Sequence, residues 1–396
     1  MNSPAIRFAG FAEDWEERKL GDVAEFNPKA VLPNTFEYVD LESVVGTELI
    51  GHRTESRATA PSRAQRLAQR GDVFYQTVRP YQKNNYIFTL PYCDYVFSTG
   101  YAQMRPSISS SFLFSRLQGD SFVKTVLDRC TGTSYPAINA TDLSEVKIMM
   151  PDDEVEQAKI GATFCKLDRL ITLHQREHDK TVNIKKALLE KMFPKDGEDK
   201  PEIRFAGFTG AWEQRKLGNL VEFFSGLTYS PHNVVSDGTL VLRSSNVKEG
   251  AIINADNVFV EAECVNVSNV QVGDIVVVVR NGSRNLIGKH ALIKRSMPNT
   301  VIGAFMTGLR CHIPEFTNAL LDTHHFDNEI KKNLGATINQ ITTGEFKKMT
   351  FFVPEQSEQK KIGRIFTLLD NLIAQHQREL TKLQNIKKAL LEKMFV

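Results

Sequence analysis

The residue types best able to make specific polar contacts lie in two loops that each follow a predicted strand. The candidate contact residues of the first loop are Arg79, Tyr81, Lys83, Asn84 and Asn85. Those of the second loop, which occupies the matching place later in the chain, are Arg280, Asn281, Ser283, Arg284 and Lys289. Arginine can pair with guanine, and asparagine with adenine, through two hydrogen bonds to a base edge, and both cationic side chains attract phosphates. These loops are therefore candidate nucleic-acid contacts, and an exposed polar turn is the alternative interpretation of each.

Similar residue types recur in further loops of the chain. The candidates there are Thr133, Ser134, Thr228, Tyr229, Arg243, Ser245, Asn246, Thr337, Asn339 and Gln340. For the loops around Thr133 and Asn339, a purely structural turn is an equally good explanation.

Two sequence patterns that could indicate an enzyme are incomplete. The segment from Gly282 to His290 resembles a phosphate-binding loop, but its spacing is one residue too long, and His290 stands where Ser or Thr should bind magnesium. Asn27-Pro28-Lys29 lacks the second proline and the aromatic residue of the motif found in adenine methyltransferases. Since no glycine-rich cofactor loop follows a predicted strand, we expect this chain to have no catalytic residues and to bind no cofactor.

A pair of histidines comes nearest to a metal site. His174 and His178 lie four residues apart on a predicted helix, as metal ligands can. A repeated copy of this helix keeps only His376 and has Leu380 at the second position. We therefore expect these histidines to lie in a helix seam or on the surface, and we expect no metal site.

The composition is that of an ordinary globular protein with locally basic segments. The 396 residues are 41% hydrophobic and 24% charged, with a net charge of +2. Residues 280–295 contain five basic residues and no acidic one, which fits a protein that contacts phosphates in a few places, although uneven surface charge is an alternative. The five cysteines are scattered without a C-x-x-C pair, and neither a signal-peptide pattern nor an apolar run of about 18 residues occurs. We expect a reduced, cytoplasmic location and no membrane contact.

The elements that must position the candidate loops are written twice. Residues 183–193 return letter for letter as 385–395, and a looser match continues upstream at a constant offset of 202 residues. In the second copy Phe366, Leu369, Ile373, His376 and Leu380 step by three and four, which is the spacing of a coiled-coil seam. We expect two helices of about forty residues, each roughly 60 Å long, that pack antiparallel against each other.

The repeat also includes the start of each half. Residues 6–11, Trp15 and residues 18–21 return as residues 203–208, Trp212 and residues 215–218. We predict an α+β protein with a pseudo-two-fold internal repeat. Its mixed α/β domains occupy residues 1–150 and 203–353, its spacer helices residues 151–193 and 354–396, and a polar linker residues 194–202.

The two globular stretches differ far more than their flanks do. Residues 72–78 and 274–279 are β-rich runs that each lead into an arginine, Arg79 or Arg280. Similar flanking segments around dissimilar central sequences predict a shared scaffold that carries two different recognition surfaces.

This pattern resembles the specificity subunits of type I restriction–modification systems. The resemblance covers essentially the whole chain and depends on the paired start motifs, the paired Gly-Asp strands and the paired helices that end in residues 187–193 and 389–395. It implies two target recognition domains that each read one half of a split, asymmetric DNA sequence. It also implies that the helices fix the distance between the two halves and dock the methyltransferase subunits.

The resemblance further implies partners that perform the chemistry. These are double-stranded DNA, two methyltransferase subunits that modify adenine, and restriction and translocase subunits that act in host defence. The partners, and not this chain, would use S-adenosylmethionine, ATP and Mg²⁺. Two alternatives remain open: a single-chain methyltransferase or nuclease, which would act alone, and a coiled-coil adaptor, which would show no salt-dependent affinity for DNA.

Overall fold

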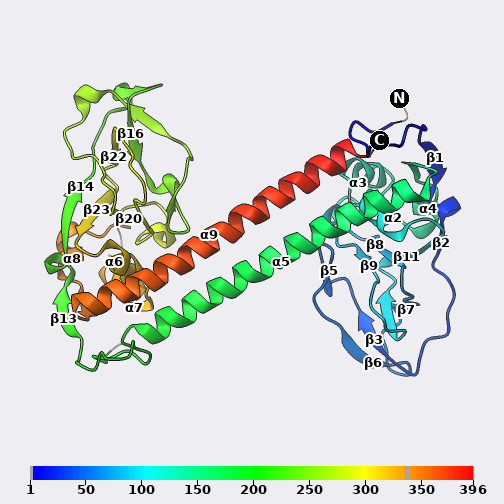
Figure 1. Cartoon of the computed structure of the whole chain (residues 1–396), viewed down its shortest axis with the longest axis horizontal. Helices are drawn as coiled ribbons and strands as arrows, with labels where there is room; N and C mark the ends of the chain where they lie inside the picture. Colours follow the sequence, from blue (N-terminus) through cyan, green and yellow to red (C-terminus); the bar gives the residue numbers. More distant parts are fainter. Residues whose placement is uncertain (1–2, 196, 335–338, 396) are drawn as a thin grey trace. The chain divides into compact units, whose positions relative to one another are not determined.

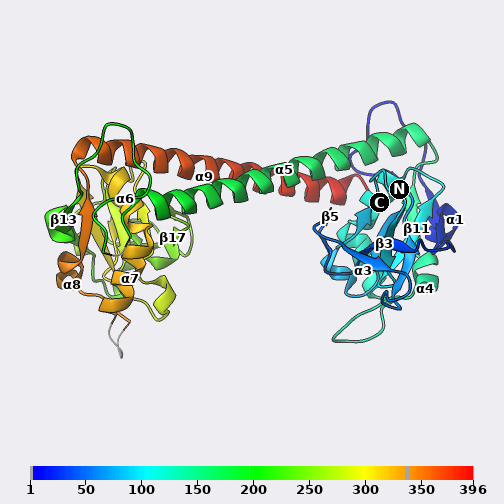
Figure 2. The ribbon, with the colours of Figure 1, turned by 90° about the horizontal axis from the view of Figure 1, so that it is seen from below.

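The computed structural model describes residues 3–195, 197–334 and 339–395, and the chain forms two compact units (Figures 1 and 2). Unit 1 comprises Met1–Arg176 and His376–Val396, and unit 2 comprises Glu177–Gln375. The boundaries between the units fall inside two long helices, α5 (Glu154–Met192) and α9 (Gln356–Lys393). The prediction of a mixed α and β protein with two long helices is confirmed.

The two long helices begin a few residues later than predicted because a proline and an acidic residue precede each of them. Asp153 Oδ1 accepts hydrogen bonds from the amides of Val155 and Glu156, at 2.7 and 3.0 Å, and so caps the start of α5. At α9 the amide of Glu358 bonds the carbonyl of Glu355 at 3.1 Å.

Within unit 1, α5 and α9 lie side by side and run antiparallel. The rings of Phe164 and Phe395 stack with centroids 5.6 Å apart, Asp168 pairs with Lys387, and His174 Nδ1 lies 3.2 Å from His376 Nδ1. In these contacts the residue numbers increase along α5 while those of their partners decrease along α9, so the two helices run in opposite directions. The histidines therefore lie in the helix seam.

Within unit 2, the other ends of the same helices make the repeat-equivalent contacts. Lys185 Nζ lies 2.6 Å from Asp370 Oδ1, and the ring centroids of Phe193 and Phe366 are 5.9 Å apart. The helices are thus antiparallel in this unit too.

Unit 1 carries two four-stranded sheets. One has the order β2-β11-β8-β9, built from β2 (Ala24–Phe26), β8 (Val73–Gln76), β9 (Tyr86–Ile87) and β11 (Tyr101–Pro106). The other has the order β6-β3-β10-β7, built from β3 (Thr35–Val39), β6 (Arg53–Ser56), β7 (Ala64–Leu67) and β10 (Tyr95–Ser98). The remaining elements are β4 (Val44–Val45), β5 (Glu48–Leu49), α1 (Leu20–Val23), α2 (Ser110–Leu117), α3 (Asp120–Leu127) and α4 (Ala140–Ser144).

Strand β8 is buried throughout, on both of its faces. Val73 and Tyr75 pack in a core with α2, α3, α5 and the end of α9, whereas Phe74 packs toward β3 and β10 with Phe97. Successive side chains of a strand point to opposite faces, so one run of residues supplies two cores.

Unit 2 repeats this plan in one sheet, whereas its other sheet carries the fourth strand at the opposite edge. Its two sheets have the orders β14-β23-β20-β21 and β15-β19-β16-β22. The strands are β14 (Val221–Ser225), β15 (Val234–Val235), β16 (Thr239–Leu242), β19 (Val258–Val260), β20 (Ile275–Val278), β21 (His290–Leu292), β22 (Thr300–Ile302) and β23 (Met306–Cys311). The remaining elements are β17 (Val247–Lys248), β18 (Ala251–Ile252), α6 (Pro314–Leu321), α7 (His324–Asn333) and α8 (Thr343–Lys348). Along β20, Ile275 and Val277 face one core, and Val276 and Val278 face the other.

The start motifs attach each globular region to the helices. Strand β1 (Glu16–Lys19) pairs antiparallel with β12 (Lys147–Met150), and β13 (Glu213–Lys216) pairs in the same way with β24 (Thr350–Val353). Just before these strands, Arg7 forms a two-bond ion pair with the buried Glu156, at 2.7 and 2.8 Å, and Arg204 does the same with the buried Glu358. Each pair fixes the first turn of a long helix.

Candidate nucleic-acid interface

In unit 2, one end of β20 brings together three segments that are far apart in the sequence. The amides of Val279 and Arg280 donate to the carbonyl of Phe305, at 2.9 and 3.2 Å. Arg280 forms an isolated antiparallel bridge with Gln340, and the amide of Asn281 donates to the carbonyl of Asn339 at 3.3 Å. Backbone bonds therefore hold the candidates Arg280, Asn281, Asn339 and Gln340 at one site.

Two more candidate loops join this group. Asn281 Nδ2 donates to Ser244 Oγ at 2.9 Å, which attaches the loop of Arg243 and Ser245. A Cβ atom at Gly226 would lie 2.0 Å from the carbonyl oxygen of Gly303, so the chain approaches too closely there for any other residue. The loop that begins at Gly226 carries Thr228, which is exposed, and Tyr229, which packs partly against the sheet beneath.

Asn246 is buried and has a structural role. Its Oδ1 accepts from the amide of Arg243 at 2.9 Å, and its Nδ2 donates to Ala255 O and Asn257 Oδ1, at 2.7 and 2.9 Å. Its amide group thus holds the loop that presents Arg243 and Ser245.

The rest of the second loop turns back toward β21. Ser283, Arg284 and Lys289 are exposed, and residues Arg284–Leu286 form a single 3-10 turn. The amide of Val278 donates to the carbonyl of Lys289 at 2.8 Å, so Lys289 lies beside the end of β20. The predicted residue Thr337 lies outside the described residues.

In unit 1, Arg79 lies in the left-handed region, with φ of 54° and ψ of 56°, which turns the chain sharply after β8. Its amide donates to the carbonyl of Pro136 at 2.8 Å, and its guanidinium carbon lies 4.4 Å from the ring centroid of Tyr135. Thr133 and Ser134, in the same short segment, are exposed. The structure therefore unites two loops that the sequence separates by more than fifty residues.

The other candidates of the first loop serve mainly to hold it in place. Lys83 Nζ donates to the carbonyl of Gln118 at 2.9 Å and pairs with Asp120. Asn84 Oδ1 accepts from the amide of Gly46 at 2.8 Å, and the buried Asn85 accepts through Oδ1 from the amide of Gln76 at 2.8 Å. Tyr81 is half exposed.

The two arginines are not at matching places, which corrects one interpretation of the sequence. Val78 bridges Ala137 in unit 1 as Arg280 bridges Gln340 in unit 2. Arg79 therefore corresponds to Asn281, and Arg280 corresponds to Val78. This offset of one residue, together with the left-handed conformation of Arg79, gives the two units different tips, by which we mean the loops that follow β8 and β20.

Sequence reasoning missed Phe305, which is 53% exposed between β22 and β23 and lies under the guanidinium of Arg280, 4.9 Å from its carbon atom. No sequence signal distinguished it, because a phenylalanine between two strands is ordinarily a core residue.

A partly buried ionic cluster lies next to the second loop. Asp322 lies 2.7 Å from Lys185 Nζ and 3.3 Å from His290 Nε2, and His290 directly follows Lys289. Burial raises the pKa of Asp322, but the attraction of His290 and Lys185 outweighs it and lowers that pKa to about 2. Burial lowers the pKa of His290, but Asp322 outweighs this effect and raises it above its ordinary value. The contact at 3.3 Å is better described as an ion pair than as a well-aligned hydrogen bond.

Among the described residues, no group of three or more His, Cys, Asp or Glu side chains could hold a metal ion. In the same part of the chain, no helix is both long enough and apolar enough to cross a membrane.

The sequence is similar to that of specificity subunits of restriction enzymes. The family model for the type I restriction modification DNA specificity domain matches residues 12–182 and 210–385. The specificity subunit of the type I restriction enzyme MjaVIII from Methanocaldococcus jannaschii is 24% identical over 295 residues, which are 71% of this chain and 68% of that protein.

One solved structure shows the same fold, and a second is reported as a similarity. The match to the crystal structure of the S subunit of the type I restriction–modification system from M. genitalium includes 100% of this chain and 99% of that chain. Its TM-score is 0.64 and the sequence identity is 16%. The HsdS subunit from Thermoanaerobacter tengcongensis covers 96% of both chains at 21% identity, with a TM-score of 0.41. Since the family model matches twice and covers most of the sequence, this chain belongs to the specificity subunits of type I restriction–modification systems and carries two target recognition domains.

Proposed function

We propose that the chain binds an asymmetric, bipartite DNA target, with one half read by unit 1 and the other by unit 2. The observation that carries this proposal is that the two units have a similar scaffold but different loops after β8 and β20. The two units share the strand order of the sheets that contain β8 and β20, and they share the helix contacts. The loops at the ends of these strands differ, because they present Arg79 with Tyr135 in unit 1 and Arg280 with Phe305 in unit 2. Two different loop surfaces on similar scaffolds would recognise two different DNA sequences.

In this proposal the helices act as a stiff spacer. Successive base pairs of B-DNA are about 3.4 Å apart and turn by about 35°, so two readers on one duplex need a fixed separation. The antiparallel contacts of α5 and α9 within each unit support such a spacer.

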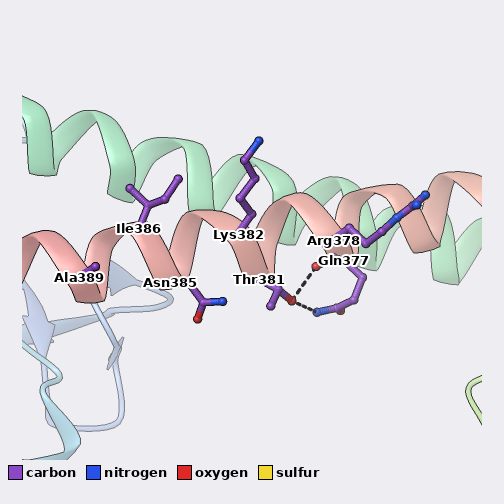
Figure 3. Close-up of a pocket in the computed structure, with 7 residues that line it drawn as sticks. All are labelled: Gln377, Arg378, Thr381, Lys382, Asn385, Ile386 and Ala389. Atoms are coloured by element: carbon purple, nitrogen blue, oxygen red, sulfur yellow. Dashed lines mark hydrogen bonds between the residues drawn. The ribbon is translucent and has the colours of Figure 1, made fainter. Parts of the chain in front are cut away.

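The helices would also dock one methyltransferase subunit near each end of the pair, and restriction and translocase subunits would join the complete complex. A shallow groove on α9 supports a docking role for its surface (Figure 3). Its lining residues are Gln377, Arg378, Thr381, Lys382, Asn385, Ile386 and Ala389. Thr381 Oγ1 donates to the carbonyl of Gln377 at 2.9 Å, which fixes part of this wall.

The chemistry would belong to the partners, which would use S-adenosylmethionine to methylate adenine, and ATP and Mg²⁺ for restriction. The chain itself would bind no cofactor and would work in the cytoplasm.

Coexpression of the chain with its methyltransferase subunit, followed by mapping of methylated adenines, tests the proposal. We expect a motif with two unlike halves separated by a fixed gap, and native mass spectrometry should find two methyltransferase subunits for each chain. The affinity of the complex for DNA should fall as salt rises, because phosphate contacts release counterions. A contiguous motif, or methylation by the chain alone, would contradict the proposal.

A further inference from the structure

One arginine at the tip of each unit lies over an exposed aromatic ring. The guanidinium carbon of Arg79 is 4.4 Å from the ring centroid of Tyr135, and that of Arg280 is 4.9 Å from the ring centroid of Phe305. Tyr135 is 63% exposed and Phe305 is 53% exposed. Because both rings are largely outside the cores, each offers one face to its arginine, and the ring quadrupole attracts the guanidinium.

The charges of these two arginines are not neutralised within the protein. Among the described residues, neither guanidinium forms an ion pair or a hydrogen bond. Two arginines of the neighbouring strands differ in this respect, because Arg105 is held by Asp72 and Arg310 by Asp274, each through two bonds of 2.8 to 3.0 Å. Arg79 and Arg280 therefore keep all of their side-chain donors for a ligand.

The backbone fixes each arginine beside its ring. The amide of Arg280 donates to the carbonyl of Phe305 itself, at 3.2 Å, and the amide of Arg79 donates to the carbonyl of Pro136, which directly follows Tyr135. With the main chain held and one face of the guanidinium on the ring, little freedom remains to the planar group.

The internal repeat does not account for the two pairs. Arg79 corresponds to Asn281, and Arg280 corresponds to Val78, as the bridges to Ala137 and Gln340 establish. Tyr135 precedes Ala137, whereas Phe305 comes from the turn between β22 and β23. The two arginine–aromatic pairs are thus built from residues at non-equivalent positions. Their occurrence in both units indicates that both loops need an arginine held in a fixed orientation.

That requirement is met by a guanine edge. A guanidinium held in one plane can donate two parallel hydrogen bonds to O6 and N7 of guanine in the major groove, whereas a phosphate is satisfied by a cation in many orientations. We propose that Arg79 and Arg280 each read one guanine, in different halves of the DNA target, and that Tyr135 and Phe305 are positioning residues for them. This inference rests on the proposed function and adds the chemistry of one base to each half.

The test uses the full chain purified with its methyltransferase subunit and the duplex that methylation mapping identifies. Each guanine of the duplex is replaced in turn by 7-deazaguanine, which lacks the N7 acceptor, and affinity is measured by competition at one salt concentration. We expect one guanine in each half at which the replacement weakens binding by about 5- to 140-fold.

Variants then assign each guanine to its reader. Arg280→Ala should remove the effect of 7-deazaguanine in one half only, and Arg79→Ala should remove it in the other half. Phe305→Leu should reduce the effect about 2- to 5-fold, whereas Phe305→Tyr should preserve it. Arg295→Ala is the matched control, because Arg295 is also exposed and lies in the same unit.

The outcomes separate this inference from the proposed function. If Arg280→Ala weakens all duplexes equally and lowers the salt dependence by about one counterion, the arginine contacts a phosphate and the inference is wrong. A bipartite target with no guanine in one half would also overturn it, and the proposed function would stand. A target without two separated halves would overturn both.

Discussion

Replacing Lys185 with methionine should destabilise unit 2 more than the equivalent change, Lys387→Met, destabilises unit 1. Lys185 Nζ lies 2.7 Å from Asp322 and 2.6 Å from Asp370, so its loss removes the cation beside Asp370 and leaves Asp322 with His290. Lys387 occupies the repeat-equivalent position, but among the described residues its one ion pair is with Asp168, because Asp120 of unit 1 pairs with Lys83. Methionine preserves the length of the side chain and the helix propensity.

The magnitudes follow from burial. Breaking a fully buried ion pair costs about 3–5 kcal/mol, and breaking an exposed one costs about 0–1 kcal/mol. The side chains of Lys185, Asp322 and Asp370 are 18%, 25% and 21% exposed, which places each contact between these limits. We expect Lys185→Met to cost about 2–3 kcal/mol and Lys387→Met about 1–2 kcal/mol.

The difference between wild type and Lys185→Met should also depend on pH. The pKa of Asp322 in the folded protein is about 2, below its unfolded value, so its stabilising contribution is present above the unfolded pKa and is lost as pH falls through about 2. In the variant the pKa of Asp322 should rise, since its lysine is gone and burial remains. The cost of the substitution should therefore be largest at neutral pH and should shrink below about pH 4.

Hydrogen exchange followed by mass spectrometry can measure the two units separately, with α6 peptides reporting on unit 2 and α2 peptides on unit 1. Equal losses for the two variants, or a cost for Lys185→Met that does not change with pH, would refute the reasoning.

Three further predictions concern the attachment of unit 2 to the helices and its dependence on pH. A Cβ atom at Gly363 of α9 would lie 2.7 Å from the amide nitrogen of Phe316. Gly363→Ala should therefore lower the free energy of unfolding in urea by about 1–3 kcal/mol, even though alanine favours a helix. Gly282→Ala is the control and should be nearly neutral, because a Cβ atom there would have no atom within 4 Å. Glu358→Gln should cost about 3 kcal/mol by the same measurement, because it leaves Arg204, 15% exposed, without its buried anion; an unchanged unfolding midpoint would contradict this. The raised pKa of His290 stabilises the fold below its unfolded pKa, so stability should fall as pH rises through the folded pKa, and thermal unfolding of His290→Asn should lack that dependence.

Sequence reasoning succeeded where local periodicity determines structure. The spacing of Phe366, Leu369 and Ile373 predicts α9, and the runs of β-branched and aromatic residues within 72–78 and 274–279 predict β8 and β20. Such patterns reflect the geometry of a helix or strand and need no knowledge of distant residues.

The tips could not be predicted to the same depth, because contacts between distant segments decide them. Asn85 and Asn246 have the side chains of base readers but are buried and hold their own loops. Phe305 has the side chain of a core residue but lies exposed beside Arg280. The places of the individual candidates on a DNA surface thus stay predictions.

The most direct test of the central claim is to exchange one target recognition domain and to map the methylated DNA sequence. Residues 1–150 are replaced by the corresponding region of another specificity subunit, the hybrid is coexpressed with the methyltransferase subunit, and methylated adenines are mapped. The account predicts that one half of the motif changes while the other half and the gap stay the same. A motif in which both halves change, or in which neither does, would contradict the division of recognition between two unlike units.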